Sequence, residues 1–259
     1  MADERIRVAS EGAVATITLD RPEKLHALDP AMLQRLGEVI AEIDGSQEIR
    51  AVIVTASGDR AFCVGADINA WSALPPLEMW RRWVRDGHRV FDAVARLRQP
   101  TIAALNGFAF GGGLELALAC DIRIAAEGVE LAAPEVKIGT LPGWAGTRRL
   151  PAIIGVGRAK QMIFTGARVD AAMAERWGLV NEVVPRGDLM ARAQSLAAEI
   201  AANAPIAVQL AKQAIDGALG EGTATALEAM AGALAATTDD GREGIAAFRG
   251  KRSPVFENR

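Results

Sequence analysis

The sequence of 259 residues has few of the side chains that most metal sites and nucleophilic sites need. It holds two histidines, His26 and His88, and two cysteines, Cys63 and Cys120. No cluster of His, Cys or Asp has the spacing of metal ligands, so we expect neither a metal site nor a histidine-based triad. Both cysteines lie in apolar surroundings, which predicts buried thiols in a reducing compartment and not a disulfide framework.

Long apolar runs and a large charge excess are also missing. No stretch reaches the roughly 18 apolar residues of a membrane span, and the polar amino-terminal residues lack the apolar core of a signal peptide. The formal net charge is −3, which argues against general binding to nucleic acid or to a membrane surface. The sequence therefore predicts a cytoplasmic globular protein with neither of these partners.

Apolar segments and amphipathic helices alternate along the first half of the chain. Asp29 and Pro30 suit the N-cap and the first position of a helix, and apolar residues then recur at helical spacing to about residue 44. Residues 70–97 predict a second helical region, broken by Pro75 and Pro76. Strands are expected at residues 12–19, 51–55, 61–64, 101–105 and 121–125. This order predicts an α/β fold with right-handed crossovers and a mainly parallel sheet.

From residue 148 onward the pattern is mainly helical. It predicts one strand at residues 180–184 and helices at residues 148–155, 157–164, 170–177, 188–202, 205–219, 223–237 and near 241–249. We therefore divide the chain into an α/β core, residues 1–186, and an all-helical region, residues 187–259. The alanine-rich helices of the second region need a surface to pack against, which is typical of an interaction platform.

Residues 106–121 contain three consecutive glycines, Gly111 to Gly113, between an apolar strand and a helix. Glycines allow backbone N–H groups to approach a ligand closely, and a helix N-terminus adds positive potential at the same place. No Lys-Ser or Lys-Thr follows, and the spacing is not that of a dinucleotide fingerprint. Glu115 falls in the first helical turn. On these residues alone, a site for developing negative charge and a simple tight turn with a solvated glutamate are equally good interpretations.

Two further features also have a plain structural interpretation. Glu135 lies in a loop rich in proline and glycine, residues 131–147, and its position alone favours a solvated charge over a catalyst. Trp71, Trp80 and Trp83 lie in the broken helical region, where core packing is favoured over the wall of an apolar pocket.

Four stretches together carry a resemblance to a known family. They are residues 61–68 (AFCVGADI), 106–121 (NGFAFGGGLELALACD), 133–150 (APEVKIGTLPGWAGTRRL) and 243–248 (EGIAAF). In their order and spacing, the chain resembles the enoyl-CoA hydratase/isomerase (crotonase) superfamily over essentially its full length, and it looks most like an enoyl-CoA hydratase.

The resemblance implies a ββα spiral core and a helical C-terminal region that forms homotrimers and often hexamers. It implies an acyl-CoA thioester as substrate, as in fatty acid β-oxidation, with no metal or redox cofactor. The oxyanion hole would be the backbone N–H groups of Ala66 and Gly112. Both glutamates of the family's hydratases are matched, by Glu115 and Glu135, whereas isomerases usually keep one of the two.

Other positions match the family's substrate-binding segments. Lys24, Leu25 and Ala27 lie in the loop that approaches the adenosine end of CoA, and Phe248 and Lys251 fall where the C-terminal helix approaches the CoA of a neighbouring subunit. Further matching positions are Gly65, Asp67, Ile68, Gly111, Pro134, Gly143 and Trp144.

The implied reaction is syn addition of water to a 2-trans-enoyl-CoA, which gives a 3-hydroxyacyl-CoA. Negative charge develops on the thioester oxygen, and preorganised N–H donors stabilise it. Glu115 would act mainly as the base that activates water, and Glu135 mainly as the acid that protonates C2. Two adjacent carboxylates titrate as a coupled pair, so these single roles are a simplification.

Two departures and three alternatives stay open. His26 replaces an asparagine found in many relatives, and Trp144-Ala145-Gly146 replaces a run of small residues, so Trp144 either narrows the acyl pocket or packs under the loop. The chain could instead be an enoyl-CoA isomerase or another lyase or hydrolase of the superfamily. It could also be a catalytically weak acyl-CoA-binding protein, or an RNA-binding relative with a basic face at Arg81, Arg82, Arg85 and Arg89.

Overall fold

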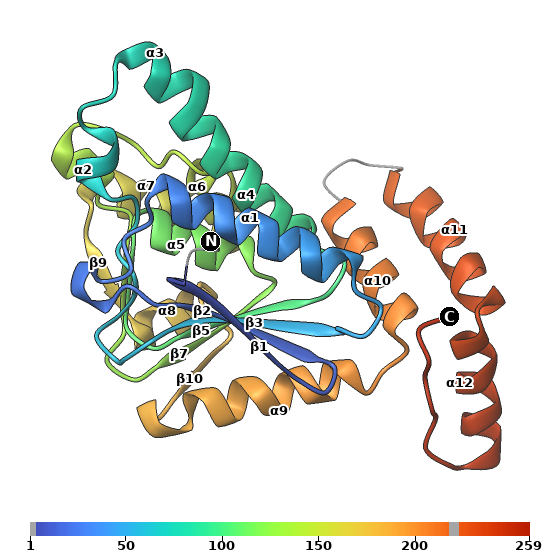
Figure 1. The fold of residues 1–259 in the computed structure, drawn as a ribbon. Helices are drawn as coiled ribbons and strands as arrows, with labels where there is room; N and C mark the ends of the chain where they lie inside the picture. The colour runs from blue at the N-terminus through green and yellow to red at the C-terminus, as the bar shows by residue number, and fades with distance from the viewer. Residues whose placement is uncertain (1–3, 218–222) are drawn as a thin grey trace.

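The computed structural model describes residues 4–217 and 223–259 (Figure 1). A six-stranded sheet forms its centre, in the order β1-β2-β3-β5-β7-β10. These strands are β1 (Ile6–Glu11), β2 (Val14–Leu19), β3 (Ala51–Ala56), β5 (Thr101–Leu105), β7 (Ile122–Ala126) and β10 (Glu182–Val184). β1 is antiparallel to β2, and the other neighbours run parallel. All residues of β3 and β5 are buried, as their unbroken apolar sequences predict.

A second, smaller sheet lies beside the first and carries the glycine turn. Its order is β4-β6-β8-β9, with β4 (Ala61–Cys63), β6 (Phe108–Phe110), β8 (Glu130–Ala132) and β9 (Arg168–Asp170). Neighbours run parallel except β8 and β9. Along the chain, a strand of the large sheet is followed by a strand of the small sheet and then by helical segments, as in β3-β4-α2 and β5-β6-α5. This repeat is the predicted ββα order.

The helices of the core cover the two faces of the large sheet. Figure 1 shows α1 (Pro30–Gly45) and α4 (Arg85–Arg96) over one face and α9 (Leu189–Ala201) over the other. α1 begins as predicted, because the Asp29 carboxylate accepts the N–H of Met32 at 3.0 Å. The region before α4 is broken into α2 (Ile68–Trp71), α3 (Pro76–Glu78) and a π-helical segment, Met79–Val84. The remaining core helices are α5 (Gly112–Ala119), α6 (Gly146–Ile154), α7 (Val156–Thr165) and α8 (Ala171–Trp177).

Three helices follow α9 and extend from the core in Figure 1: α10 (Pro205–Gly217), α11 (Thr223–Thr237) and α12 (Asp239–Gly250). The end of the helix expected at residues 205–219 lies outside the described residues. Lys212 of α10 donates to the Asp121 carboxylate at 2.7 Å, and Arg50 donates to the carbonyl of Phe256 at 2.7 Å. These contacts tie the C-terminal helices to the sheet.

The division at residue 186 stays a prediction, and the packing of α9 bears on it. The buried residues of α9 lie against β3 and β5, so this helix packs as part of the core although it belongs to the predicted helical region. In the part of the chain that the structure describes, no helix has the length and apolar character to span a membrane.

Candidate active site

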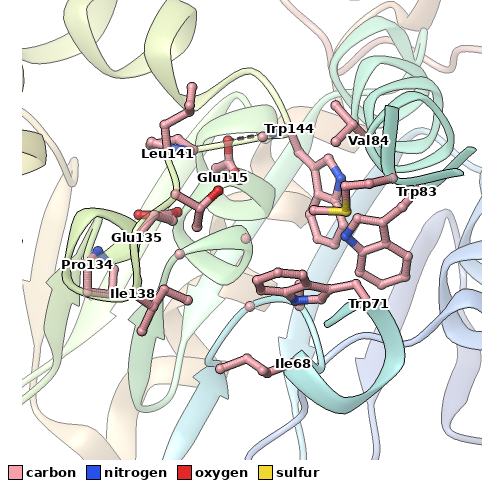
Figure 2. A pocket seen from close by; sticks show the side chains of 18 of the residues that line it. Ile68, Trp71, Trp83, Val84, Glu115, Pro134, Glu135, Ile138, Leu141 and Trp144 are labelled. Carbon is pink, nitrogen blue, oxygen red and sulfur yellow. Dashed lines mark hydrogen bonds between the residues drawn. The ribbon is translucent and has the colours of Figure 1, made fainter. Parts of the chain in front are cut away.

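A cavity of about 680 Å³ lies between the glycine turn, the loop before α6 and the segments from α2 to α4. Figure 2 shows side chains that line it. The lining brings together many of the predicted site residues, which come from three of the four stretches that carry the resemblance: Gly65, Ala66, Ile68, Gly111, Gly112, Glu115, Pro134, Glu135, Gly143 and Trp144. The fold therefore gathers residues of these three stretches into one cavity.

The turns that carry Ala66 and Gly112 touch through their backbones. Gly65 has φ +100°, and a Cβ atom there would lie 2.8 Å from the amide nitrogen of Gly112. A Cβ atom on Gly113 would collide with the carbonyl of Cys63. Glycine is therefore required at both positions, because a side chain would push the two turns apart.

The backbone N–H groups of Ala66 and Gly112 do not take part in the hydrogen bonds of a strand or a helix. Leu28 donates its N–H to Gly65 and accepts the N–H of Asp67, both at 2.8 Å. Because neighbouring N–H groups of an extended segment point to opposite sides, the N–H of Ala66 points away from Leu28. Gly112 is the first residue of α5, and the first N–H groups of a helix lack an intrahelical acceptor. Both residues line the cavity.

Glu115 is held by the main chain of the loop before α6. Its Oε1 atom accepts the N–H groups of Trp144 and Gly146, each at 2.7 Å. A Cβ atom on Gly146 would lie 2.8 Å from this oxygen, so only glycine allows the close approach. The side chain is 4% exposed, and its burial raises the pKa of the carboxyl, while the two N–H donors oppose that rise.

Glu135 enters the same cavity from the other side of the glycine turn. It begins a 3₁₀ turn, Glu135–Ile138, and a Cβ atom on Gly111 would lie 3.3 Å from its Oε1 atom. Its buried Oε2 atom has no hydrogen-bond partner among the described residues. Burial, with a smaller contribution from the charge of Glu115, raises the pKa of Glu135 to about 7. Figure 2 shows both carboxyl groups facing the same space.

Tryptophan dominates the opposite wall of the cavity. Four of the five tryptophans of the chain line it: Trp71, Trp80, Trp83 and Trp144. The rings of Trp83 and Trp144 are 5.5 Å apart, and Trp144 packs edge-on against Phe91 at 5.1 Å. Core packing was the favoured interpretation for the first three. It is confirmed for Trp83 and for the partly buried Trp71, and it is wrong for Trp80, which is 61% exposed. All three form part of the pocket wall. Trp144 does both of the things the sequence left open, since it narrows the cavity and packs in the core.

Comparison with known proteins shows the family of the chain. The family model of enoyl-CoA hydratase/isomerase matches residues 9–259. The chain belongs to the enoyl-CoA hydratase/isomerase family. It is 42% identical to a short-chain-enoyl-CoA hydratase of Clostridium acetobutylicum over 96% of both chains, and 37% identical to a crotonyl-CoA hydratase of Syntrophomonas wolfei over 99% of both chains.

The fold agrees with solved structures of the same family. A crystal structure of an enoyl-CoA hydratase from Bacillus anthracis matches with a TM-score of 0.95 at 40% identity, over 99% of this chain and 100% of that one. This match confirms the predicted α/β class, with the spiral core followed by C-terminal helices.

Several residues that the family resemblance points to do not line the cavity. A neighbouring loop carries Lys24, Leu25 and Ala27. The carbonyl of Leu25 accepts the N–H of Val64 at 3.2 Å, which holds this loop beside the cavity lining. Asp67 turns toward Arg21, with a 2.9 Å ion pair.

Phe248 lies in the last turn of α12 and Lys251 follows its end, across the molecule from α2 and α3 in Figure 1. Phe248 is 86% exposed. The single chain does not bring these two residues to the cavity, so their expected contact with CoA stays a prediction about a neighbouring subunit.

His26 explains one departure from the family pattern. Its ring is buried, with Nδ1 accepting the N–H of Arg21 and Nε2 facing the carbonyl of Ser57, both at 3.0 Å. This arrangement requires the neutral tautomer with a proton on Nε2, and burial lowers the pKa of the ring. His26 therefore clamps the loop of Lys24 and does not enter the cavity.

The sequence did not single out several other residues of the lining, including Met79, Val84, His88, Ile138 and Leu141. The π-helical segment changes the periodicity before α4, so a reading at 3.6 residues per turn does not show which face meets the cavity. The density of tryptophan was the signal that could have identified this wall. Among the described residues, no group of three or more His, Cys, Asp or Glu is placed to hold a metal ion.

Proposed function

We propose that this protein is an enoyl-CoA hydratase, which adds water to a 2-trans-enoyl-CoA and yields a 3-hydroxyacyl-CoA. One observation carries the proposal: two glutamates face one cavity beside the free N–H groups of Ala66 and Gly112. Glu115 accepts two backbone hydrogen bonds, whereas one oxygen of Glu135 has no partner among the described residues. The relatives named as hydratases support it.

The thioester oxygen would accept the N–H groups of Ala66 and Gly112. Addition at C3 moves an electron pair onto this oxygen, and the resulting enolate needs donors that are already in place. Loss of one such donor typically raises a barrier by about 3 kcal/mol. The N-terminus of α5 adds its positive potential at the same atom.

The two carboxyl groups divide the proton transfers. Burial raises the pKa of Glu115, whereas the N–H groups of Trp144 and Gly146 favour its ionised form. We assign this group to take the proton of the attacking water because its oxygen is already held by these two donors. Glu135, with its pKa near 7 and an oxygen without a partner, holds a proton that it delivers to C2. The proton then rests on Glu115 and returns to Glu135 to complete the cycle. Because both groups face the same space, addition is syn.

The finer assignments belong to the same proposal. CoA would lie along the loop of Lys24, Leu25 and Ala27, with Phe248 and Lys251 supplied by a neighbouring subunit of a homotrimer or a dimer of trimers. The steps use carboxylates and amides alone, so they need no resident cofactor. We place the protein in the cytoplasm because Cys63 and Cys120 are buried free thiols, whose pKa burial raises to about 12.

An RNA-binding function has little support in the basic face before and within α4. Arg82 pairs with Glu78 at 3.9 Å, and Arg89 pairs with Asp86 at 2.9 Å. Acidic neighbours thus offset half of the positive charge that the sequence suggested.

The test is the hydration of crotonyl-CoA, followed by the loss of absorbance of the conjugated double bond. Glu115→Gln and Glu135→Gln should each lower kcat by about 10²- to 10⁴-fold and leave the affinity for CoA nearly unchanged. Glu127→Gln, at an exposed glutamate, is the control for the loss of one charge. A near wild-type rate in either variant would contradict that residue's role, and activity on a 3-enoyl-CoA alone would favour an isomerase.

A further inference from the structure

Trp83 separates the candidate active site from a second cavity. This second cavity, of about 550 Å³, lies between α1 and the segments from α2 to α4. Its lining includes Pro30, Leu33, Leu74, Arg82 and Val90, together with Trp83. Trp83 also lines the cavity of Glu115 and Glu135, so one side chain borders both spaces.

The indole of Trp83 is held firmly in this position. The residue is 6% exposed and lies in the π-helical segment. Its ring packs on Trp144, which in turn packs on Phe91. Trp144 cannot retreat, because it lies against Gly87 of α4 and Gly112 of α5 so closely that a Cβ atom on either glycine would collide with its ring. The wall between the cavities is therefore the indole of Trp83, held by tilted and edge-on contacts among buried rings.

The wall lies where an acyl chain would end. In Figure 2, Glu135 lies on one side, Trp83 and Trp144 lie on the other, and Glu115 lies between them. A thioester bound at Ala66 and Gly112 places C2 and C3 beside the carboxyl groups, and the apolar lining beyond Glu115 is formed by residues such as Val84 and Trp83. An acyl chain that extends from C3 therefore meets the ring of Trp83.

We propose that Trp83 is the partition that ends the acyl-binding part of the cavity, so that it restricts the protein to short 2-enoyl groups. The second cavity is then an extension, lined by apolar residues such as Leu33 and by exposed charged side chains such as Arg82, which a linear chain could occupy if the ring were removed. This inference rests on the proposed function, because it assigns a substrate class to the same site.

The test compares chain-length preference in the wild type and in Trp83→Ala. The substrates are 2-enoyl-CoA thioesters of 4, 6, 8, 10 and 12 acyl carbons, and the readout is kcat/KM for each relative to that for crotonyl-CoA. Each newly buried methylene favours binding by about 0.8 kcal/mol, or about fourfold. The ratio for dodecenoyl-CoA should therefore rise at least about tenfold in the variant, while the wild type should lose activity as the chain lengthens.

Matched variants separate the partition from general loosening of the wall. Val90→Ala enlarges the second cavity without touching the first, so its length preference should equal that of the wild type. Trp83→Phe keeps a ring and should change the ratio less than Trp83→Ala. Trp83→Leu is measured beside them, since it retains an apolar side chain if the alanine variant fails to fold.

Direct binding keeps this test independent of the proposed reaction. Titration calorimetry with butanoyl-CoA and decanoyl-CoA should show that Trp83→Ala, or Trp83→Leu in its place, gains affinity for the longer ligand alone. A wild type that hydrates all chain lengths equally would overturn the partition. An unchanged length preference in the folded variants would do the same. A wild type that binds short acyl-CoA but hydrates no 2-enoyl-CoA would overturn the proposed function and leave the binding result to decide the partition.

Discussion

Glu135 combines a buried carboxyl group with an oxygen that has no partner, and this combination makes stability depend on pH. Its pKa in the folded protein is about 7, against an ordinary value of 4.5. The folded chain therefore binds this proton more tightly than the unfolded chain does. The free energy of unfolding should fall as pH rises from about 4.5 through about 7.

Glu135→Gln removes this titration. A pKa difference of one between the folded and unfolded chain corresponds to about 1.4 kcal/mol, so the variant should gain about 2 kcal/mol of stability relative to the wild type between pH 5 and pH 8. Urea unfolding at both pH values measures the difference, with Glu127→Gln as the control for net charge. An equal stability difference at pH 5 and pH 8 would show that Glu135 titrates normally.

Residues in the site differ in how far the sequence could identify them. The glycines and Glu115 lie in one motif, and a strand followed by a helix N-terminus already indicates where their amides point. Glu135 and Trp144 lie at least 20 residues away, in a loop without periodicity, so only the resemblance singled them out. From its position in the sequence alone, Glu135 was expected to be a solvated charge. The structure instead buries one of its oxygens, because the 3₁₀ turn directs the side chain at Gly111.

At the scale of elements, α4 and α5 meet through the indole of Trp144. The ring fits only because Gly87 and Gly112 lack side chains, and the main chain of the same tryptophan holds Glu115. A shift of α4 would therefore displace Trp144, and Trp144 would in turn displace the carboxyl group of Glu115.

Gly87→Ala tests this contact. The new methyl group would overlap the indole, and overpacking of this kind typically costs about 1–3 kcal/mol. The displaced ring should also lower kcat, because Trp144 positions Glu115. Gly157→Ala is the control, since a Cβ atom there meets nothing within 4 Å. Thermal unfolding and crotonyl-CoA hydration measure both effects, and wild-type values for Gly87→Ala would show that the ring can move freely.

The elements also show where the periodicity of the sequence is sufficient to predict a helix or a strand and where it is not. α1 follows from its Asp-Pro start and its buried stripe, and β3 and β5 follow from unbroken apolar runs. β6, β8 and β9 have three residues each, too few for a period to emerge. β1 was missed because most of its residues are exposed on a sheet edge. Apart from β4, which the strand expected at residues 61–64 matches, the small sheet thus comes from tertiary pairing that local sequence does not encode.

At the scale of the whole molecule, a buried ion pair joins the C-terminal helices to the central sheet. Lys212 of α10 donates to the carboxylate of Asp121, which also accepts the N–H and hydroxyl of Thr101 in β5. The lysine is nearly enclosed, with 8% of its side chain exposed. Removal of one partner leaves the other charge partly buried, which is costly.

Lys212→Met should therefore loosen α10 more than the core. We expect a loss of about 2 kcal/mol of stability, less than for a fully buried pair because Asp121 keeps its other donors. Amide hydrogen exchange should accelerate in α10 while β5 stays protected. Lys160→Met, at an exposed lysine on α7, should leave both unchanged. Equal acceleration in α10 and β5 would mean that the helices and the sheet unfold as one unit.

The tryptophan wall also gives the molecule an optical property. The chain has no tyrosine, and Trp177 is the one indole outside the cavity lining. Ultraviolet emission from the protein therefore originates mostly at the place where a substrate would arrive. With Trp177→Phe, the remaining fluorescence would come from this wall alone, so that ligand entry can be followed without turnover and without an attached dye.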